Sequence, residues 1–143
     1  IAMIGAGAIA AAYADALRRV PELHLAAVVD PDPQARARFA DRTATFADLV
    51  AVRHHREVVV LDVRRADEHE KTWIEGAVNI PIHELPRRLD EVPAGEVWVH
   101  CAGGYRASIA ASFIAAAGRD LVAIDDSFDN AADSGLPMVG PEA

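Results

Sequence analysis

Val97-Trp98-Val99-His100-Cys101-Ala102-Gly103-Gly104-Tyr105-Arg106-Ala107-Ser108 is the stretch that decides the fold, because three kinds of local structure follow one another in it. Its apolar beginning predicts a short strand, and the two glycines after the cysteine indicate a loop. The alanine-rich run that follows predicts a helix ending at Gly118. Such a strand–loop–helix unit aims successive backbone N–H groups at one point, at the positive end of the helix dipole.

The chain's only cysteine, Cys101, stands at that point. The N–H groups and the helix end favour the thiolate over the thiol, and the thiolate is the form that a sulfur nucleophile needs. Arg106 closes the loop with a permanent positive charge, so we predict that Cys101 and Arg106 carry the chemistry. The residues between them would form the active-site loop: Ala102, Gly103, Gly104 and Tyr105. The alternative is a buried structural cysteine in front of a helix.

The spacing of these two residues distinguishes between kinds of chemistry. Cys101 and Arg106 enclose four residues, which makes a loop of six residues counting both ends. This loop resembles the active-site loop of the rhodanese family, whose members carry a persulfide on the cysteine. Protein tyrosine phosphatases and their relatives have one residue more between Cys and Arg, which makes a cradle wide enough for phosphate. The shorter loop suits a single sulfur atom better; a phosphatase or arsenate reductase on the same scaffold is the disfavoured alternative.

Further stretches carry the same resemblance, which covers residues 43–143. An apolar run typical of a strand buried on both faces leads into Asp62-Val63-Arg64, which matches the family's Asp-Val-Arg signature. The family's Gly-Ala and Asn-Ile-Pro are present within Gly76–Pro81, and its closing Gly-Leu-Pro is Gly135–Pro137. Two stretches depart from the family: Thr72-Trp73 stand where Gly-His is common, and Asp126-Ser127 where Gly-Gly is common.

The resemblance implies supporting roles for several residues around the loop. Asp62 and Arg64 would brace the loops from the carboxyl end of the sheet, where ligands of open α/β sheets collect. From the residues alone, they also fit a surface ion-pair cluster with nearby acidic side chains: Asp67, Glu68 and Glu70. Ser108, in the first helical turn, would contact the loop or cap the helix. His100 points to the opposite face from its neighbour Cys101, so we expect it in the core or behind the site.

Residues 1–42 form a separate block with a different pattern. One apolar stretch runs into Gly5 and Gly7, a helical pattern follows, and a second apolar stretch ends at Asp30. Two glycines for a turn and an acid after the second strand are a dinucleotide-binding fingerprint. The block resembles the opening βαβ unit of the glucose–fructose oxidoreductase-like dehydrogenases, in which these three residues would bind NAD(P). The resemblance stops at residue 42, so we expect an incomplete segment kept for packing, or grafted onto a second domain, rather than a working cofactor site.

The composition of the 143-residue chain bounds its partners. A net charge of −8 argues against binding to nucleic acid or to an anionic membrane. A single cysteine excludes an internal disulfide and a resolving cysteine, so a persulfide would pass to an outside acceptor. The neighbouring His54 and His55 diverge in direction, which favours a solvated turn over a metal site.

The sequence contains no signal peptide and no apolar run of transmembrane length, so we expect a cytoplasmic protein. Since it starts at Ile1, we expect a fragment or a trimmed chain.

The sequence thus predicts an α/β fold: a rhodanese-like domain (43–143) with a central, mainly parallel sheet flanked by helices, after a Rossmann-type βαβ segment (1–42). The resemblance implies a sulfurtransferase that needs no cofactor. It would move a sulfane sulfur from thiosulfate or a low-molecular-weight persulfide to a thiol or cyanide, through a persulfide on Cys101. His100–Ser108 is also similar to rhodanese domains fused to persulfide-dioxygenase-type metallohydrolases, which favours these donors. The alternative is a non-catalytic rhodanese-like or nucleotide-sensing module.

Overall fold

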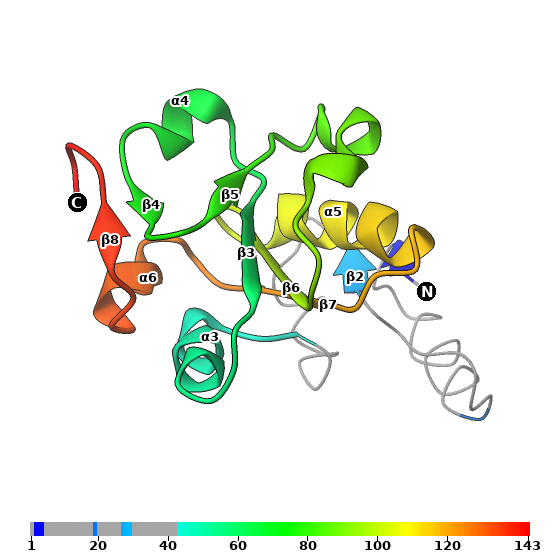
Figure 1. The fold of residues 1–143 in the computed structure, drawn as a ribbon, viewed down its shortest axis with the longest axis horizontal. Coiled ribbons are helices and arrows are strands. Elements are labelled where there is room, and N and C mark those ends of the chain that lie inside the picture. The colour runs from blue at the N-terminus through cyan, green and yellow to red at the C-terminus, as the bar shows by residue number, and fades with distance from the viewer. Residues whose placement is uncertain (1, 5–18, 20–26, 30–42) are drawn as a thin grey trace.

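The computed structural model describes residues 2–4, 19, 27–29 and 43–143 (Figure 1). Its centre is a sheet of four parallel strands in the order β5 (Val78–Asn79), β3 (Val59–Asp62), β6 (Val97–His100) and β7 (Leu121–Ala123). All neighbouring strands pair in parallel, with Asp62 opposite His100 at the ends of β3 and β6. The expected parallel sheet is therefore confirmed.

Both faces of this sheet are covered, which explains why the central strands are apolar without interruption. Leu61 of β3 and Val97 and Val99 of β6 point into one apolar cluster, which includes residues of α5 (Tyr105–Ala116). Val60 and Trp98 point the other way, into a second cluster with residues of α3 (Phe46–Arg53) and α6 (Asn130–Asp133). Figure 1 shows α3 and α5 on opposite sides of the sheet.

The connection between β3 and β6 contains short elements only. α4 (Ala66–His69) follows β3, and β4 (Trp73–Ile74) pairs antiparallel with β8 (Met138–Val139) near the C-terminus. Two 3₁₀ helices follow, Leu85–Arg87 and Leu89–Glu91, where the apolar spacing of Ile82, Leu85 and Leu89 alone predicts one short helix over residues 82–89. Pro86 interrupts the pattern, because a proline inside a helix removes a backbone donor.

Two strands of the N-terminal block lie within the described residues. β1 (Ala2–Ile4) and β2 (Ala27–Val29) pair in parallel, and both lie beside α5. Apart from Arg19, the segment between them, with the predicted helix and with Gly5 and Gly7, lies outside the described residues, and so does Asp30. Within the described part of the chain, none of the helices has the length and apolar character needed to cross a bilayer.

Candidate active site

The loop that opens on Cys101 lies where β6 ends and α5 begins, as the sequence predicts. Gly104 is the N-cap of α5 and has φ +85°, a conformation that residues with a Cβ rarely adopt. A Cβ at this position would collide with Asp125 Oδ1 and lie 3.0 Å from Asp125 Cα. Because the N–H groups in the first turn of a helix have no acceptor within the helix, those of Tyr105 and Arg106 are available to an anion near the loop.

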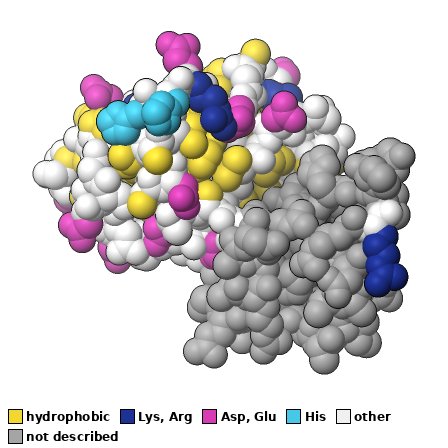
Figure 2. Space-filling model, turned by 90° about the horizontal axis from the view of Figure 1, so that it is seen from below, with side chains coloured by type: hydrophobic (Ala, Val, Ile, Leu, Met, Phe, Trp, Pro, Cys, Tyr) yellow, Lys and Arg dark blue, Asp and Glu magenta, His cyan; other side chains and the backbone are white. Residues whose placement is uncertain are grey.

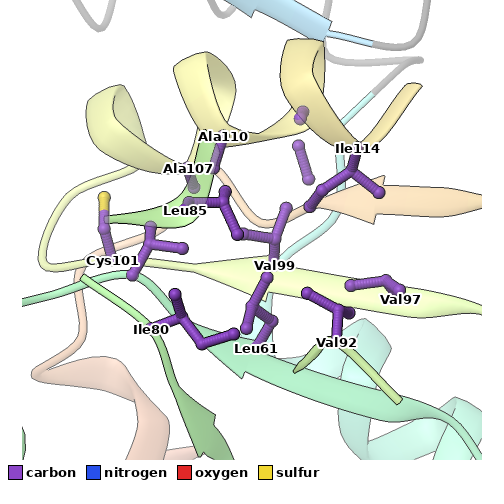
Figure 3. Close-up of a cluster of buried hydrophobic side chains, with 13 residues drawn as sticks. Leu61, Ile80, Leu85, Val92, Val97, Val99, Cys101, Ala107, Ala110 and Ile114 are labelled. Carbon is purple, nitrogen blue, oxygen red and sulfur yellow. The ribbon is translucent and has the colours of Figure 1, made fainter. Parts of the chain in front are cut away.

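The side chain of Cys101 lies beneath this loop and is only 1% exposed. It belongs to the apolar cluster under α5, and Figure 3 shows its sulfur at the end of that cluster beside the first turn of the helix. The loop above it is open to solvent, since Ala102, Gly103 and Tyr105 are exposed, Tyr105 to 42%. The thiol is thus buried but separated from solvent by one loop only.

The guanidinium of Arg106 lies close enough to Cys101 for the two side chains to interact electrostatically. The same guanidinium forms a bidentate ion pair with Glu68 of α4: Nη1 donates to Oε2 over 2.7 Å, and Nη2 donates to Oε1 over 2.8 Å. The hydrogen bonds from Arg106 lower the pKa of Glu68 to about 2. The hydrogen bond to Glu68 raises the pKa of Arg106, and the neighbouring Cys101 adds to that effect.

Two hydrogen bonds fix the loop to the surrounding structure. The buried hydroxyl of Ser108 donates to the carbonyl of Gly104 over 3.0 Å, so Ser108 contacts the loop rather than capping the helix with its side chain. The backbone N–H of Phe128 donates to the carbonyl of Ala102 over 2.9 Å. These contacts hold the loop from its two ends, through α5 and through the segment after β7.

Asp62 and Arg64 form a buried ion pair behind the loop. Arg64 Nη2 donates to Asp62 Oδ2 over 2.6 Å, and the two side chains are 4% and 0% exposed. Burial opposes the charge of Asp62, but the attraction of His100 and the hydrogen bond from Arg64 outweigh it and lower the pKa of Asp62. Asn79 donates to the carbonyls of both residues, at 3.0 and 3.1 Å, and so fixes this turn. The alternative of a surface ion-pair cluster is wrong, because this pair is buried.

The departure at Thr72-Trp73 is accommodated by a histidine from α4. The Nδ1–H of His69 donates to Asp62 Oδ2 over 2.8 Å, and its ring stacks on Trp73 with centroids 5.3 Å apart. The carbonyl of Thr72 accepts a hydrogen bond from Arg64 Nη2 over 2.8 Å. Imidazole and indole thus lie together against the buried ion pair, although the tryptophan stands where histidine is common in the family.

His100 lies in the core, on the side of the sheet opposite Cys101. It is fully buried, stacks on Phe128 at 5.3 Å and 11°, and meets Phe46 edge-on. Neither of its ring nitrogens has a hydrogen-bond partner among the described residues. Arg64 covers the Phe128 ring at 3.5 Å, a cation–π contact that joins this aromatic group to the buried ion pair. His100 is therefore a core residue, as the alternation along the strand predicts.

The other candidate residues lie away from the loop. Asp126, one of the two residues that depart from the family's Gly-Gly, accepts the N–H of Phe46 at the start of α3 and the side-chain amide of Asn130. His54 and His55 are exposed in the turn after α3, and Figure 2 shows histidine side chains grouped on that face. In the part of the chain that the structure describes, no group of three or more His, Cys, Asp or Glu side chains is placed to hold a metal ion.

Two acidic residues beside the loop were not singled out from the sequence. The sequence places Glu68 only in the alternative surface cluster around Asp62, and it gives no functional indication for Asp125. Glu68 lies 38 positions before its partner Arg106, and no local pattern signals such a pairing. Asp125 lies two residues after the end of β7, so the carboxyl-end rule for parallel strands was the available signal.

A parallel sheet that presents a six-residue cysteine loop at a helix N-terminus defines the class of this protein: it is the architecture of rhodanese-like domains. The model of that family matches residues 45–133. The chain therefore belongs to the rhodanese-like domain family.

The chain is also similar to individual proteins. The chain is 36% identical over 97 residues to an HTH-type transcriptional regulator of Mycobacterium tuberculosis, a match that covers 66% of this chain and 43% of that protein. It is 30% identical over 88 residues to a sulfurtransferase of Allochromatium vinosum, covering 60% of this chain and 82% of that protein. The chain thus spans less than half the length of the mycobacterial relative.

Solved structures share the fold. A rhodanese-related protein from Thermoplasma volcanium superposes with a TM-score of 0.61 at 28% identity, covering 68% of this chain and 96% of that one.

Proposed function

We propose that the protein is a sulfurtransferase that carries a sulfane sulfur as a persulfide on Cys101. The observation that carries this proposal is the placement of Cys101: it opens a six-residue loop at the N-terminus of α5, and the loop closes on Arg106. An anionic sulfur at this point would be stabilised by the loop N–H groups and the helix end. The likeness to a sulfurtransferase supports the same assignment.

In the proposed reaction, the thiolate of Cys101 attacks the outer sulfur of the donor. A bond forms between the two sulfur atoms, and the bond between the outer sulfur and the rest of the donor breaks, with its electron pair leaving on the donor. With thiosulfate the leaving group is sulfite; with a persulfide it is the corresponding thiolate. A thiol or cyanide then removes the outer sulfur and regenerates Cys101, so the cycle needs no cofactor.

Each residue of the site has a part in this scheme. Arg106 orients the anionic part of the donor, and the exposed Tyr105 shapes the mouth of the site. Asp62, Arg64 and Ser108 touch no reacting atom in this scheme; they position the turn and the loop around Cys101.

Mass spectrometry of the intact protein tests the proposal. After incubation with thiosulfate or with glutathione persulfide, we expect the mass of one sulfur atom to be added to the protein and to be lost again on treatment with cyanide. Cys101→Ser provides the control and should gain nothing. Absence of the added sulfur from the wild-type protein with both donors would refute the assignment.

The second candidate is a non-catalytic rhodanese-like module, and the burial of Cys101 at 1% exposure favours it. The relative in Mycobacterium tuberculosis is named as a regulator rather than an enzyme. This candidate predicts a stable fold with no sulfur uptake in the same experiment, so one measurement separates the two.

A further inference from the structure

The positive charge of the site is already paired within the protein. Arg106 presents two of its N–H groups to the two oxygens of Glu68, the geometry in which arginine binds a carboxylate most strongly. Both side chains are 26% exposed, so solvent screens this pair only in part. An anionic donor that needs the guanidinium therefore has to compete with a carboxylate held in the protein.

The other charged side chains near the loop add no net positive charge to the site. Glu68 is ionised at neutral pH, because Arg106 holds the pKa of Glu68 near 2. The neighbouring cation Arg65 is 65% exposed; it binds Asp67 through two nitrogens, and its Nε also lies 3.5 Å from Glu68 Oε2. The side chain of Asp125 lies close to Gly104 of the loop. Both arginines, Arg65 and Arg106, are thus paired with carboxylates, within a chain of net charge −8.

We infer that Glu68 is a specificity-determining residue that selects against dianionic sulfur donors such as thiosulfate and in favour of donors with little net charge, such as cysteine persulfide. This inference rests on the proposed function and names its substrate class. Thiosulfate would bring two negative charges to an anionic thiolate beside a guanidinium that is already neutralised. Negative charges that lie so close together repel one another unless a nearby cation compensates them.

Cysteine persulfide avoids this penalty, because its ammonium group offsets its carboxylate. The transfer step is balanced without any further reactant. The Cys101 thiolate attacks the terminal sulfur of the protonated persulfide, the sulfur–sulfur bond of the donor breaks, and cysteine leaves as its thiolate. The proton of the donor stays on the transferred sulfur, so Cys101 ends as a protonated persulfide.

A charge-neutral substitution of Glu68 tests the inference. Glu68→Gln keeps the size of the side chain and one acceptor for Arg106 but removes the competing charge. We expect the rate of sulfur loading from thiosulfate to rise about tenfold or more, while the rate with cysteine persulfide changes by less than about threefold. Asp67→Asn removes a carboxylate one residue away that pairs with Arg65 and not with Arg106; it is the matched control and should alter neither rate.

If Glu68→Gln slows loading from both donors equally, Glu68 only positions Arg106 and the inference is wrong. An unchanged ratio of the two rates overturns it as well.

Anion binding gives a readout that does not depend on sulfur transfer. In the Cys101→Ser background no persulfide can form, and titration calorimetry measures the affinity for thiosulfate alone. We expect Glu68→Gln to tighten this binding about tenfold or more. If the wild-type protein accepts no sulfur but Glu68→Gln still tightens thiosulfate binding, the proposed function is refuted and the charge effect of Glu68 is not. If the wild-type protein accepts sulfur but Glu68→Gln leaves thiosulfate binding unchanged, the inference about Glu68 is refuted and the proposed function is not.

Discussion

His100 shows how a single buried side chain sets the pH dependence of stability. The ring has no exposed surface and lacks hydrogen-bond partners in the described structure. Burial lowers the pKa of His100 to about 4; the nearby Asp62, 3.9 Å away, opposes this shift, and Arg64 adds to it. His100 is therefore neutral in the folded protein at neutral pH and contributes through its stacking on Phe128.

The sign of the pH effect follows from the two protonation states. In the unfolded chain His100 binds a proton near pH 6.5, whereas in the folded protein it does so only near pH 4. Between these values the unfolded state holds more protons, so the free energy of unfolding falls as the pH falls. We expect His100 to account for a loss of roughly 3 kcal/mol between pH 6.5 and pH 4, and for no slope above pH 7.

Urea unfolding at a series of pH values measures this slope. His100→Gln removes the titrating group and should flatten the profile in this window, whatever its effect on the absolute stability. His83→Gln, at an exposed histidine, is the matched control and should leave the slope as in the wild type. A profile that keeps its full slope in His100→Gln would show that another group causes it.

The lowered pKa values of Asp62 and Glu68 affect stability in a different pH range, because their contributions are lost only as the pH falls below about 4.5.

At the scale of single elements, α3 depends on its first turn. Thr45 Oγ1 accepts the N–H of Asp48, and the Asp48 carboxylate accepts the N–H of Thr45, which is a capping box. Asp126, 80 positions later, accepts the N–H of Phe46 in the same turn. Two carboxylates near a helix N-terminus also complement the helix dipole.

We expect Thr45→Ala to lower the free energy of unfolding by about 1 kcal/mol, because one backbone donor of α3 loses its side-chain acceptor. Thermal unfolding followed by circular dichroism measures the change. Thr43→Ala, two residues earlier and outside the box, should have a much smaller effect. Equal losses in both variants would mean that the box adds nothing to the stability.

At this scale, the elements that depend on a local pattern of residues can be predicted from the sequence. The apolar runs that became β3 and β6 predict strands covered on both faces, and Gly104 predicts the turn into α5. The placement of Asp62 and Arg64 behind the loop also follows, since the carboxyl ends of parallel strands share one edge. The pairing of Glu68 with Arg106, and of Asp126 with α3, does not follow. Such contacts depend on how segments far apart in sequence lie over one another, which no local periodicity encodes.

At the scale of the whole molecule, α5 connects the site to the N-terminal block. Its N-terminus carries the loop, and one face packs on the sheet through Ala107, Ala110 and Ile114. β1 and β2 lie beside the same helix, and Figure 3 shows β2 on the side of α5 away from the apolar cluster. Small side chains on the sheet-facing side of α5 let the helix approach the strands closely.

Nevertheless, the four-stranded sheet, both apolar clusters and every residue of the loop lie within residues 43–143. A chain with its own core on both faces of a sheet meets the requirement for independent folding. We therefore expect residues 43–143 alone to unfold cooperatively and to accept sulfur on Cys101 at a rate close to that of the full chain. The melting temperature should fall by roughly 5 °C or more, because α5 loses the cover of β1 and β2. Calorimetry and intact-mass spectrometry of the shortened chain, with its Cys101→Ser variant as background, measure both effects.

An unfolded product would show that the N-terminal block and the rhodanese-like domain are one folding unit. A folded product that accepts no sulfur, when the full chain does, would mean that the block acts on the loop through α5.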